Sequence, residues 1–303
     1  MHVSRTVRGL LLSASIATSA SAAGSWPGEA LVAKNSVWLE AGGTTTGNVA
    51  VIDAAPGAVL ADSAELVVGA GATLSGSARA NRVRVRLGGT VDGDVLTNAL
   101  TNLGTVTGSV ITPLALPLPL SVPELPAIAP GTADVTLAPR QDLTLTAGAH
   151  RNLTLGLGTQ SDPTVLTLAG GVYHFESVSL AGWSVLQCAA PCEVRIATRL
   201  HAGLASTLGP APGAGLAPAD VQVHVAGING TTGALGAVPK AAVFGLASTL
   251  AARVHAPNGT LWVQAGSAVT GTLVARDLQL GLGVLVTKDG GSACPPSFDD
   301  GNA

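Results

Sequence analysis

Apolar and polar residues alternate along short stretches of this chain, and glycines separate the stretches. Residues 80–87, which read ANRVRVRL, show the pattern best. Successive side chains of a strand point to opposite faces, so this stretch predicts a half-buried strand with its three arginines outside and its valines and Leu87 inside. A strand with one apolar face needs other strands to cover it.

Five segments share one order of residues: a glycine, a short Thr/Val strand, a second glycine, a small polar residue and an apolar residue. The second glycines of the clearest run are about 15 to 17 residues apart, which is typical of one coil of a β-solenoid. Each coil must turn sharply, and glycine adopts positive φ with little strain, so we expect glycines at the corners. The pattern predicts an all-β parallel β-helix from segments 43–49, 71–78, 89–95, 104–110 and 266–273.

A proline-rich stretch interrupts the repeat. Residues 113–130 read PLALPLPLSVPELPAIAP. Proline cannot donate to a strand ladder and favours extended polyproline II, so this segment is predicted to be a strap laid along the solenoid or a linker. A ligand for a proline-recognising module is the alternative. We expect N-terminal coils over 23–112, the strap or linker over 113–131, C-terminal coils over 132–290 and a tail over 291–303.

The first residues predict export. Arg5 and Arg8 precede the apolar stretch 9–16, and Ala20-Ser21-Ala22 is typical of a signal-peptidase site, so we expect a signal peptide over 1–22. No later stretch predicts a membrane span. We therefore place the protein outside the cell, on its surface or in the periplasm.

The expected export also guides the interpretation of the three cysteines. In an oxidising compartment the spacing of Cys188 and Cys192 predicts a disulfide, with Cys294 left over. Zinc is the weaker interpretation, because a metal site needs four converging ligands and the chain has a single C-x3-C pair.

Composition limits the fold and the partners. Aromatic residues make up 3% and charged residues 11%, which disfavours a helical bundle with charged faces. The net charge of −3 lacks the strong positive field of nucleic-acid-binding domains, so nucleic acid is not expected as a partner.

Four motifs in order carry a resemblance to a known family. From about residue 137 to 289 the chain resembles secreted bacterial β-helix domains of adhesin-like and pilus-associated surface proteins, which implies a right-handed parallel β-helix. Residues 36–112 are similar in style to the bactofilins, and a more distant likeness runs to ice-binding β-solenoids. The motifs are LAGGVYHF (168–175), VQVHVAG (221–227), VHAPNGT (254–260) and VTGTLVARDL (269–278).

An ice-binding solenoid should present a flat, regular face. The N-terminal coils are rich in threonine, but their threonines form no sustained Thr-x-Thr ladder along the sequence, which places ice binding behind other functions. The threonines concerned are Thr44, Thr45, Thr46, Thr90, Thr105 and Thr107.

Candidate chemistry is scarce. Asp92 and Asp94 are spaced like a pair of glycosidase carboxylates, but their glycine-flanked segment favours a turn. His174 and His224 alternate with apolar neighbours and are expected to be exposed strand histidines. We expect no enzyme, no metal and no cofactor.

One charge stripe could bind a ligand. Arg82, Arg84 and Arg86 should lie on one face and could meet an anionic ligand, pair with Asp92 and Asp94, or remain solvated.

The leading hypothesis is a structural or adhesive protein of the cell envelope or matrix that self-associates through its terminal coils. A module that binds surface polysaccharide or ice is the alternative, and a polysaccharide-active enzyme is the third.

Overall fold

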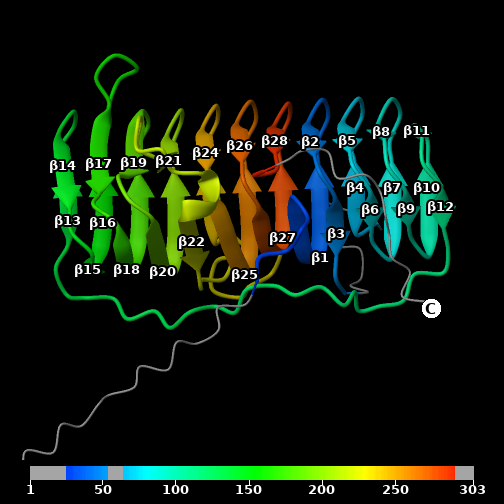
Figure 1. Cartoon of the computed structure of the whole chain (residues 1–303), viewed down its shortest axis with the longest axis horizontal. Coiled ribbons are helices and arrows are strands. Elements are labelled where there is room, and N and C mark those ends of the chain that lie inside the picture. Colours follow the sequence, from blue (N-terminus) through cyan, green and yellow to red (C-terminus); the bar gives the residue numbers. More distant parts are fainter. Residues whose placement is uncertain (1–24, 54–63, 291–303) are drawn as a thin grey trace, which may run out of the picture.

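The protein is an elongated all-β column of parallel strands (Figure 1). This computed structural model describes residues 25–53 and 64–290, so the predicted signal peptide, Cys294 and the predicted tail lie outside the described residues. One short 3-10 helix, η1 (Pro218–Asp220), accompanies the strands of the described part. No described helix is long and apolar enough to cross a membrane.

The strands form two sheets, and within each sheet the neighbouring strands pair in parallel. The 11-stranded sheet contains β2 (Thr44–Thr46), β5 (Thr73–Ser75), β8 (Thr90–Val91), β11 (Thr105–Val106), β14 (Asp142–Leu145), β17 (Thr164–Leu168), β19 (Ser184–Cys188), β21 (Thr207–Pro210), β24 (Thr249–Ala251), β26 (Ala268–Thr270) and β28 (Leu285–Thr287).

The second sheet has 17 strands. It contains β1 (Leu31–Leu39), β3 (Val49–Val51), β4 (Leu66–Val68), β6 (Ala78–Arg79), β7 (Arg82–Val85), β9 (Val95–Leu96), β10 (Ala99–Asn102), β12 (Val110–Ile111), β13 (Val135–Leu137), β15 (Gly148–Ala149), β16 (Asn152–Leu155), β18 (Gly171–Leu180), β20 (Cys192–Ala202), β22 (Val221–Val225), β23 (Ala242–Phe244), β25 (Arg253–Val263) and β27 (Leu273–Leu280).

The 17-stranded sheet is bent into two walls, so the column has three sides. Strand β1 shows the bend, because its first part pairs with β3 whereas its last part pairs with β4. Wall 1 contains β4, β7 and β10, and wall 2 contains β3, β6 and β9. Each coil crosses wall 1, then the 11-stranded sheet, then wall 2. Strands β7, β8 and β9 are one such coil in order, and β10, β11 and β12 are the next.

The spatial order of the coils differs from their order in the chain. The column begins with β13 and β14 and proceeds to β27 and β28, and there the N-terminal coils continue it. Strand β28 pairs with β2, and β27 pairs with β1. The N-terminal and C-terminal coils therefore share one column and one hydrophobic core.

The proline-rich segment connects the two ends of the column. In Figure 1 it runs alongside the coils from β12 back to β13. It holds no strand, and it contacts the column at intervals. The amide of Leu118 donates to the carbonyl of Ile52 at 3.0 Å, and the amide of Ala129 donates to Nδ1 of His174 at 3.1 Å.

The core is a stack of inward aliphatic side chains, one row for each side of the column. Val83 and Val85 point inward as the alternation predicts. Leu87 was expected inside as well, and this is wrong: its side chain is 76% exposed. Strand β7 ends at Val85, so Leu87 lies in the turn before Gly88, where alternation no longer applies.

The corner glycines serve two purposes. Gly71 and Gly88 have positive φ, as expected for sharp turns. Gly76, the second glycine of its repeat unit, is required for another reason. A Cβ on Gly76 would lie 2.4 Å from the carbonyl oxygen of Gly47 in the adjacent coil. The coils thus approach too closely at this corner for any side chain.

We expect Gly76→Ala to destabilise the column by about 1–3 kcal/mol, because the added methyl group forces two backbones apart. Gly236→Ala is the matched control, since a Cβ there meets nothing within 4 Å. Thermal unfolding of both variants measures the difference. Equal midpoints would show that the coils can separate at this corner without cost.

Candidate ligand-binding face

The outer surface of the 11-stranded sheet carries two rows of short side chains. Strand residues alternate, so each coil contributes one residue to each row and one to the core between them. The pairing register aligns these positions from coil to coil. Row 1 reads Asp142, Val165, Val185, Thr207, Thr249, Ala268, Leu285, Thr44, Thr73, Thr90 and Thr105. Row 2 reads Thr144, Thr167, Gln187, Gly209, Ala251, Thr270, Thr287, Thr46, Ser75, Asp92 and Thr107.

We call these two rows together the threonine face. Threonines occupy twelve of its 22 positions, at least one on every coil except that of β19, and all twelve are half-buried or exposed. Neighbouring strands are about 4.7–4.9 Å apart, and alternate residues on one strand are about 6.5–7 Å apart. The face is therefore a two-dimensional lattice of hydroxyl and methyl groups.

Several hydroxyl groups of this face are available to solvent. Within the described residues, the side chains of Thr44, Thr73, Thr90 and Thr105 make no hydrogen bond. Thr46 differs, because its Oγ1 donates to the carbonyl of Val286 at 3.4 Å and accepts from a neighbouring amide. Most of row 1 in the N-terminal coils can therefore bind water directly.

Charge is confined to the ends of this face. Between β17 and β5 neither row holds a charged residue; of the two carboxylates, Asp142 lies on β14 and Asp92 directly follows β8. The middle of the face is therefore uncharged.

The sequence predicted no sustained Thr-x-Thr ladder, and in the described coils both rows hold a threonine only at Thr44 with Thr46 and at Thr105 with Thr107. Only β2 of the described strands carries Thr-x-Thr within one strand, and most other coils place a single threonine in one row or the other. Thr73, Thr207, Thr249 and Thr270 were missed for this reason. Thr73 lies two residues after the corner glycine Gly71, whereas each of the other three lies four residues after a glycine, so a threonine shortly after a glycine was the available signal.

The arginine stripe lies on wall 1, with Arg82 and Arg84 on strand β7 and Arg86 directly after it, and its members have partners inside the protein. Arg82 binds the fully buried Glu65, with Nη2 2.8 Å from Oε1. The guanidinium of Arg86 lies over the ring of Trp38, 5.0 Å from its centroid. Arg84 lies between them on the same face. Binding of an anionic ligand by this stripe stays a prediction.

Asp92 and Asp94 do not lie in one environment. Asp92 is exposed in row 2, and its backbone carbonyl accepts from the hydroxyl of Thr107 at 2.6 Å. Asp94 lies in the corner after β8, and its carboxylate accepts from the amide of Ser109 at 2.8 Å. The latter contact stabilises the stacking of two corners.

His224 was expected to be exposed, and this is wrong. It points outward from wall 2, but Trp26 of the N-terminal segment covers it, so only 4% of it is exposed. His255 of the next coil is 1% exposed, with its ring centroid 5.6 Å from that of His224. The indole of Trp26 donates to Gln222 at 3.3 Å. Sequence alone gives no sign that residue 26 reaches this wall.

Charged groups surround this aromatic cluster. Glu193 Oε1 lies 3.6 Å from Nε2 of His224, and Arg195 binds Glu193. Arg253 lies over Trp26 and binds Asp289. Burial lowers the pKa of His224 to about 4, against the opposing effect of Glu193. Burial, with a smaller contribution from His224, also lowers the pKa of His255 to about 4.

His174 is half-buried beneath the proline-rich segment. Its Nδ1 accepts the Ala129 amide, and burial, with Arg195 nearby, lowers its pKa. The expected outward direction of this side chain agrees with its place between the buried Tyr173 and Phe175.

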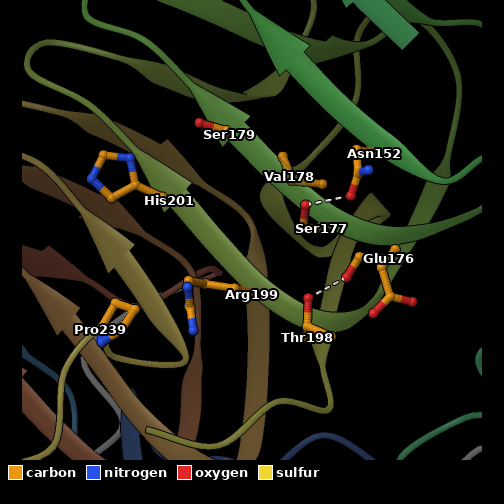
Figure 2. A pocket seen from close by; sticks show the side chains of 9 residues that line it. All are labelled: Asn152, Glu176, Ser177, Val178, Ser179, Thr198, Arg199, His201 and Pro239. Carbon is orange, nitrogen blue, oxygen red and sulfur yellow. Dashed lines mark hydrogen bonds between the residues drawn. The ribbon is translucent and has the colours of Figure 1, made fainter. Parts of the chain in front are cut away.

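A cavity of about 460 Å³ lies on wall 1 where β18 and β20 bend (Figure 2). Thr198 donates to the carbonyl of Glu176 at 2.6 Å, and Ser177 donates to Asn152 at 2.8 Å. No hydroxyl among the described residues of this cavity bonds to a histidine, so a nucleophile and its base are not paired here. The lining residues are Asn152, Glu176, Ser177, Val178, Ser179, Thr198, Arg199, His201 and Pro239.

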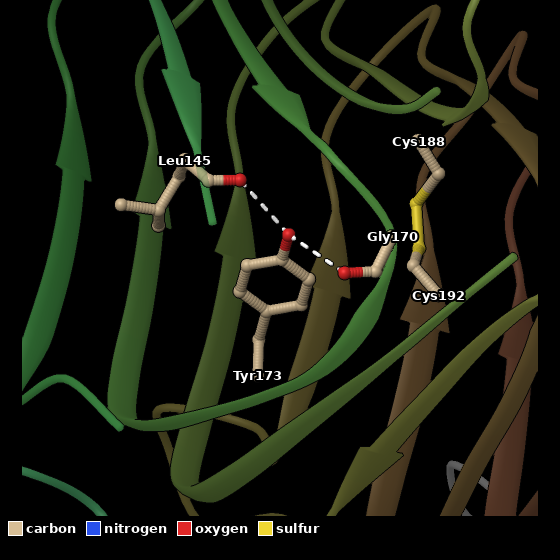
Figure 3. The surroundings of a disulfide bond; sticks show 5 residues. All are labelled: Leu145, Gly170, Tyr173, Cys188 and Cys192. Atoms are coloured by element: carbon tan, nitrogen blue, oxygen red, sulfur yellow. Dashed lines mark hydrogen bonds between the residues drawn. A yellow bond between two sulfur atoms is a disulfide. The ribbon is translucent and has the colours of Figure 1, made fainter. Parts of the chain in front are cut away.

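Cys188 and Cys192 form a disulfide at the corner between β19 and β20 (Figure 3). Both are buried. Nearby, the hydroxyl of Tyr173 lies 2.9 Å from the carbonyl of Leu145 and 3.1 Å from that of Gly170. Across residues 25–53 and 64–290, no group of three or more His, Cys, Asp or Glu side chains could hold a metal ion.

Comparison with known proteins gives two weak structural similarities. An ice-binding protein domain of Shewanella frigidimarina (DUF3494) is 15% identical, with a TM-score of 0.36 over 88% of this chain and 99% of that domain. An ice-binding protein from an Antarctic bacterium of the Flavobacteriaceae is 13% identical, with a TM-score of 0.28 over 89% and 83%. No protein-family model matches the chain. No curated protein matches it either.

The buried histidines predict a loss of stability in acid. An unfolded histidine has a pKa near 6.5, so between pH 6.5 and about 4 the unfolded state binds more protons than the folded state. The free energy of unfolding is therefore highest above pH 6.5 and falls as the pH drops towards 4, by roughly 2–3 kcal/mol for each histidine.

Urea unfolding at several pH values tests this, with His255→Gln expected to have a shallower slope between pH 6.5 and 4. His201→Gln is the control, because His201 is exposed. Identical slopes in wild type and His255→Gln would contradict the assignment.

Proposed function

We propose that this protein binds ice through the threonine face and has no catalytic activity. The observation that carries the proposal is the alignment of outward threonines in two rows on one 11-stranded sheet. Parallel pairing fixes both repeat distances of this lattice. Both are of the same order as the repeats between water oxygens on an ice surface, so one row of hydroxyl groups can meet one row of lattice water.

Threonine suits such a face for two reasons. It is β-branched, so its side chain has few rotamers and loses little entropy when water orders over it. It also pairs a hydroxyl group, which hydrogen-bonds to water, with a methyl group, which does not. Several of the neighbouring positions are small and apolar, as at Val165, Val185 and Ala268, whereas Gln187 and Leu285 are larger.

The neutral middle of the face supports the same proposal. Charged side chains bind water strongly in their own geometry, and none interrupts the rows between β17 and β5. A site for an anionic or sugar ligand would need converging polar groups in a concave pocket. The threonine face is long and its groups do not converge, so it suits a repeating solid rather than a single small molecule.

This proposal reverses the order of the sequence hypotheses. None of the described surfaces above points to adhesion, whereas the alternative has a defined surface. The two structural neighbours are ice-binding proteins, but at TM-scores of 0.36 and 0.28 the proposal depends on this chain's own residues.

An exported location accompanies the proposal. The Cys188–Cys192 disulfide is typical of an oxidising compartment. Together with the N-terminal signal expected from the sequence, it favours a place outside the cell, where ice forms.

We expect the protein to produce thermal hysteresis and to concentrate in a slowly growing ice crystal. Thr73→Lys in row 1, made together with Thr46→Lys in row 2, should remove most of both effects, because two long charged side chains disrupt the rows where the threonines of adjacent coils are aligned. Nanolitre osmometry measures the hysteresis.

Thr154→Lys is the matched control, since Thr154 is an exposed strand threonine on wall 1. Its hysteresis should equal that of the wild type. Wild-type protein that is excluded from ice would refute the proposal. An equal loss of thermal hysteresis in the double variant and in Thr154→Lys would show that the threonine face is not the ice-binding surface.

A further inference from the structure

The interior of the column is open at both ends. Val110 of β12 points inward and is 50% exposed, whereas Val95, its partner one coil further in, is fully buried. At the other end Leu143 of β14 is 43% exposed, whereas its partner Leu166 is fully buried. Within the described residues, nothing covers the apolar interior at either end.

The backbone edges are open as well. Strands β10, β11 and β12 pair only with the preceding coil, and β13, β14 and β15 pair only with the following one. Soluble β proteins normally guard such edges with charged residues or proline. Residues 99–111 contain neither. This end therefore lacks the usual protection against pairing with another chain.

The two ends are complementary in the order of their strands: the strand that would come next at one end is of the same kind as the first strand at the other. Each coil runs through wall 1, the 11-stranded sheet and wall 2. One end finishes with a complete coil, β10 to β12, and the other starts with a complete coil, β13 to β15. The element that should follow β12 is a wall 1 strand, and β13 is such a strand.

The column already contains one joint of this kind. Strand β28 pairs with β2, and β27 pairs with β1, although the paired strands are far apart in the sequence. The order of the walls and the parallel pairing continue across this contact. Seven residues of β1, for example Leu31 opposite Leu273, take up the register of β27. Lateral pairing and a shared apolar interior are thus sufficient to join coils that are distant in the chain.

We propose that a second copy of this chain docks with its β13–β15 end on the β10–β12 end of the first. Strands β10, β11 and β12 would pair with β13, β14 and β15 of the second copy, and Val110 and Leu143 would become buried. The contact joins two different surfaces, so it leaves a free end on each side and generates an open filament. Each added copy also extends the rows of the 11-stranded sheet.

Substitutions at the two ends test the proposal in the full chain. Sedimentation velocity of the wild type should show species that lengthen as concentration rises. Val110→Lys and Leu143→Lys each place a charge in one half of the contact, so each variant alone should sediment as a monomer. Leu87→Lys is the control, because Leu87 is an exposed leucine on a turn; it should assemble like the wild type.

A mixture of the two end variants gives a sharper result. Each retains one intact end, so an equimolar mixture of Val110→Lys and Leu143→Lys should form dimers and nothing longer. Circular dichroism of each variant alone checks that it is folded. A wild type that stays monomeric at all concentrations, or assembly that persists in folded Val110→Lys, would overturn the proposal, and neither outcome bears on ice binding by the monomer.

Discussion

One constraint governs this molecule: a coil can bury its inward side chains only when another coil covers it. Parallel hydrogen-bonded pairing supplies that cover and at the same time fixes the register of every residue. The core and the threonine face are consequences of the same register, because inward and outward residues alternate on one strand. The loss of one corner contact therefore affects both the packing inside and the regularity outside.

Much of the fold could be predicted from the sequence. Alternation over residues 80–87 gave the correct inward valines, and the spaced glycines gave coils of the correct kind. The prediction that Leu87 points inward was wrong because the strand ends two residues earlier, at Val85. The order of the coils could not be predicted, because the pairing of β1 with β27 involves residues 31–39 and 273–280, and no local pattern reports such a distant contact.

The candidate site was harder to predict than the fold. Its threonines come one or two at a time from separate coils, so a search along the chain finds fragments of the rows. Only the register aligns Thr73 with Thr44 and Thr90. The burial of His224 was missed for a similar reason, because the residue that covers it, Trp26, is remote in sequence. In both cases long-range geometry, rather than residue type, decided the environment.

The proline-rich connection has a consequence for how such a protein can change in size. It spans the column from β12 to β13, so its reach must match the number of coils. One more coil adds about 4.8 Å to the column, whereas a polyproline residue reaches about 3.1 Å. A duplication of one coil is therefore viable only with an insertion of one or two residues in this connection. The number of coils and the length of the connection must change together during evolution.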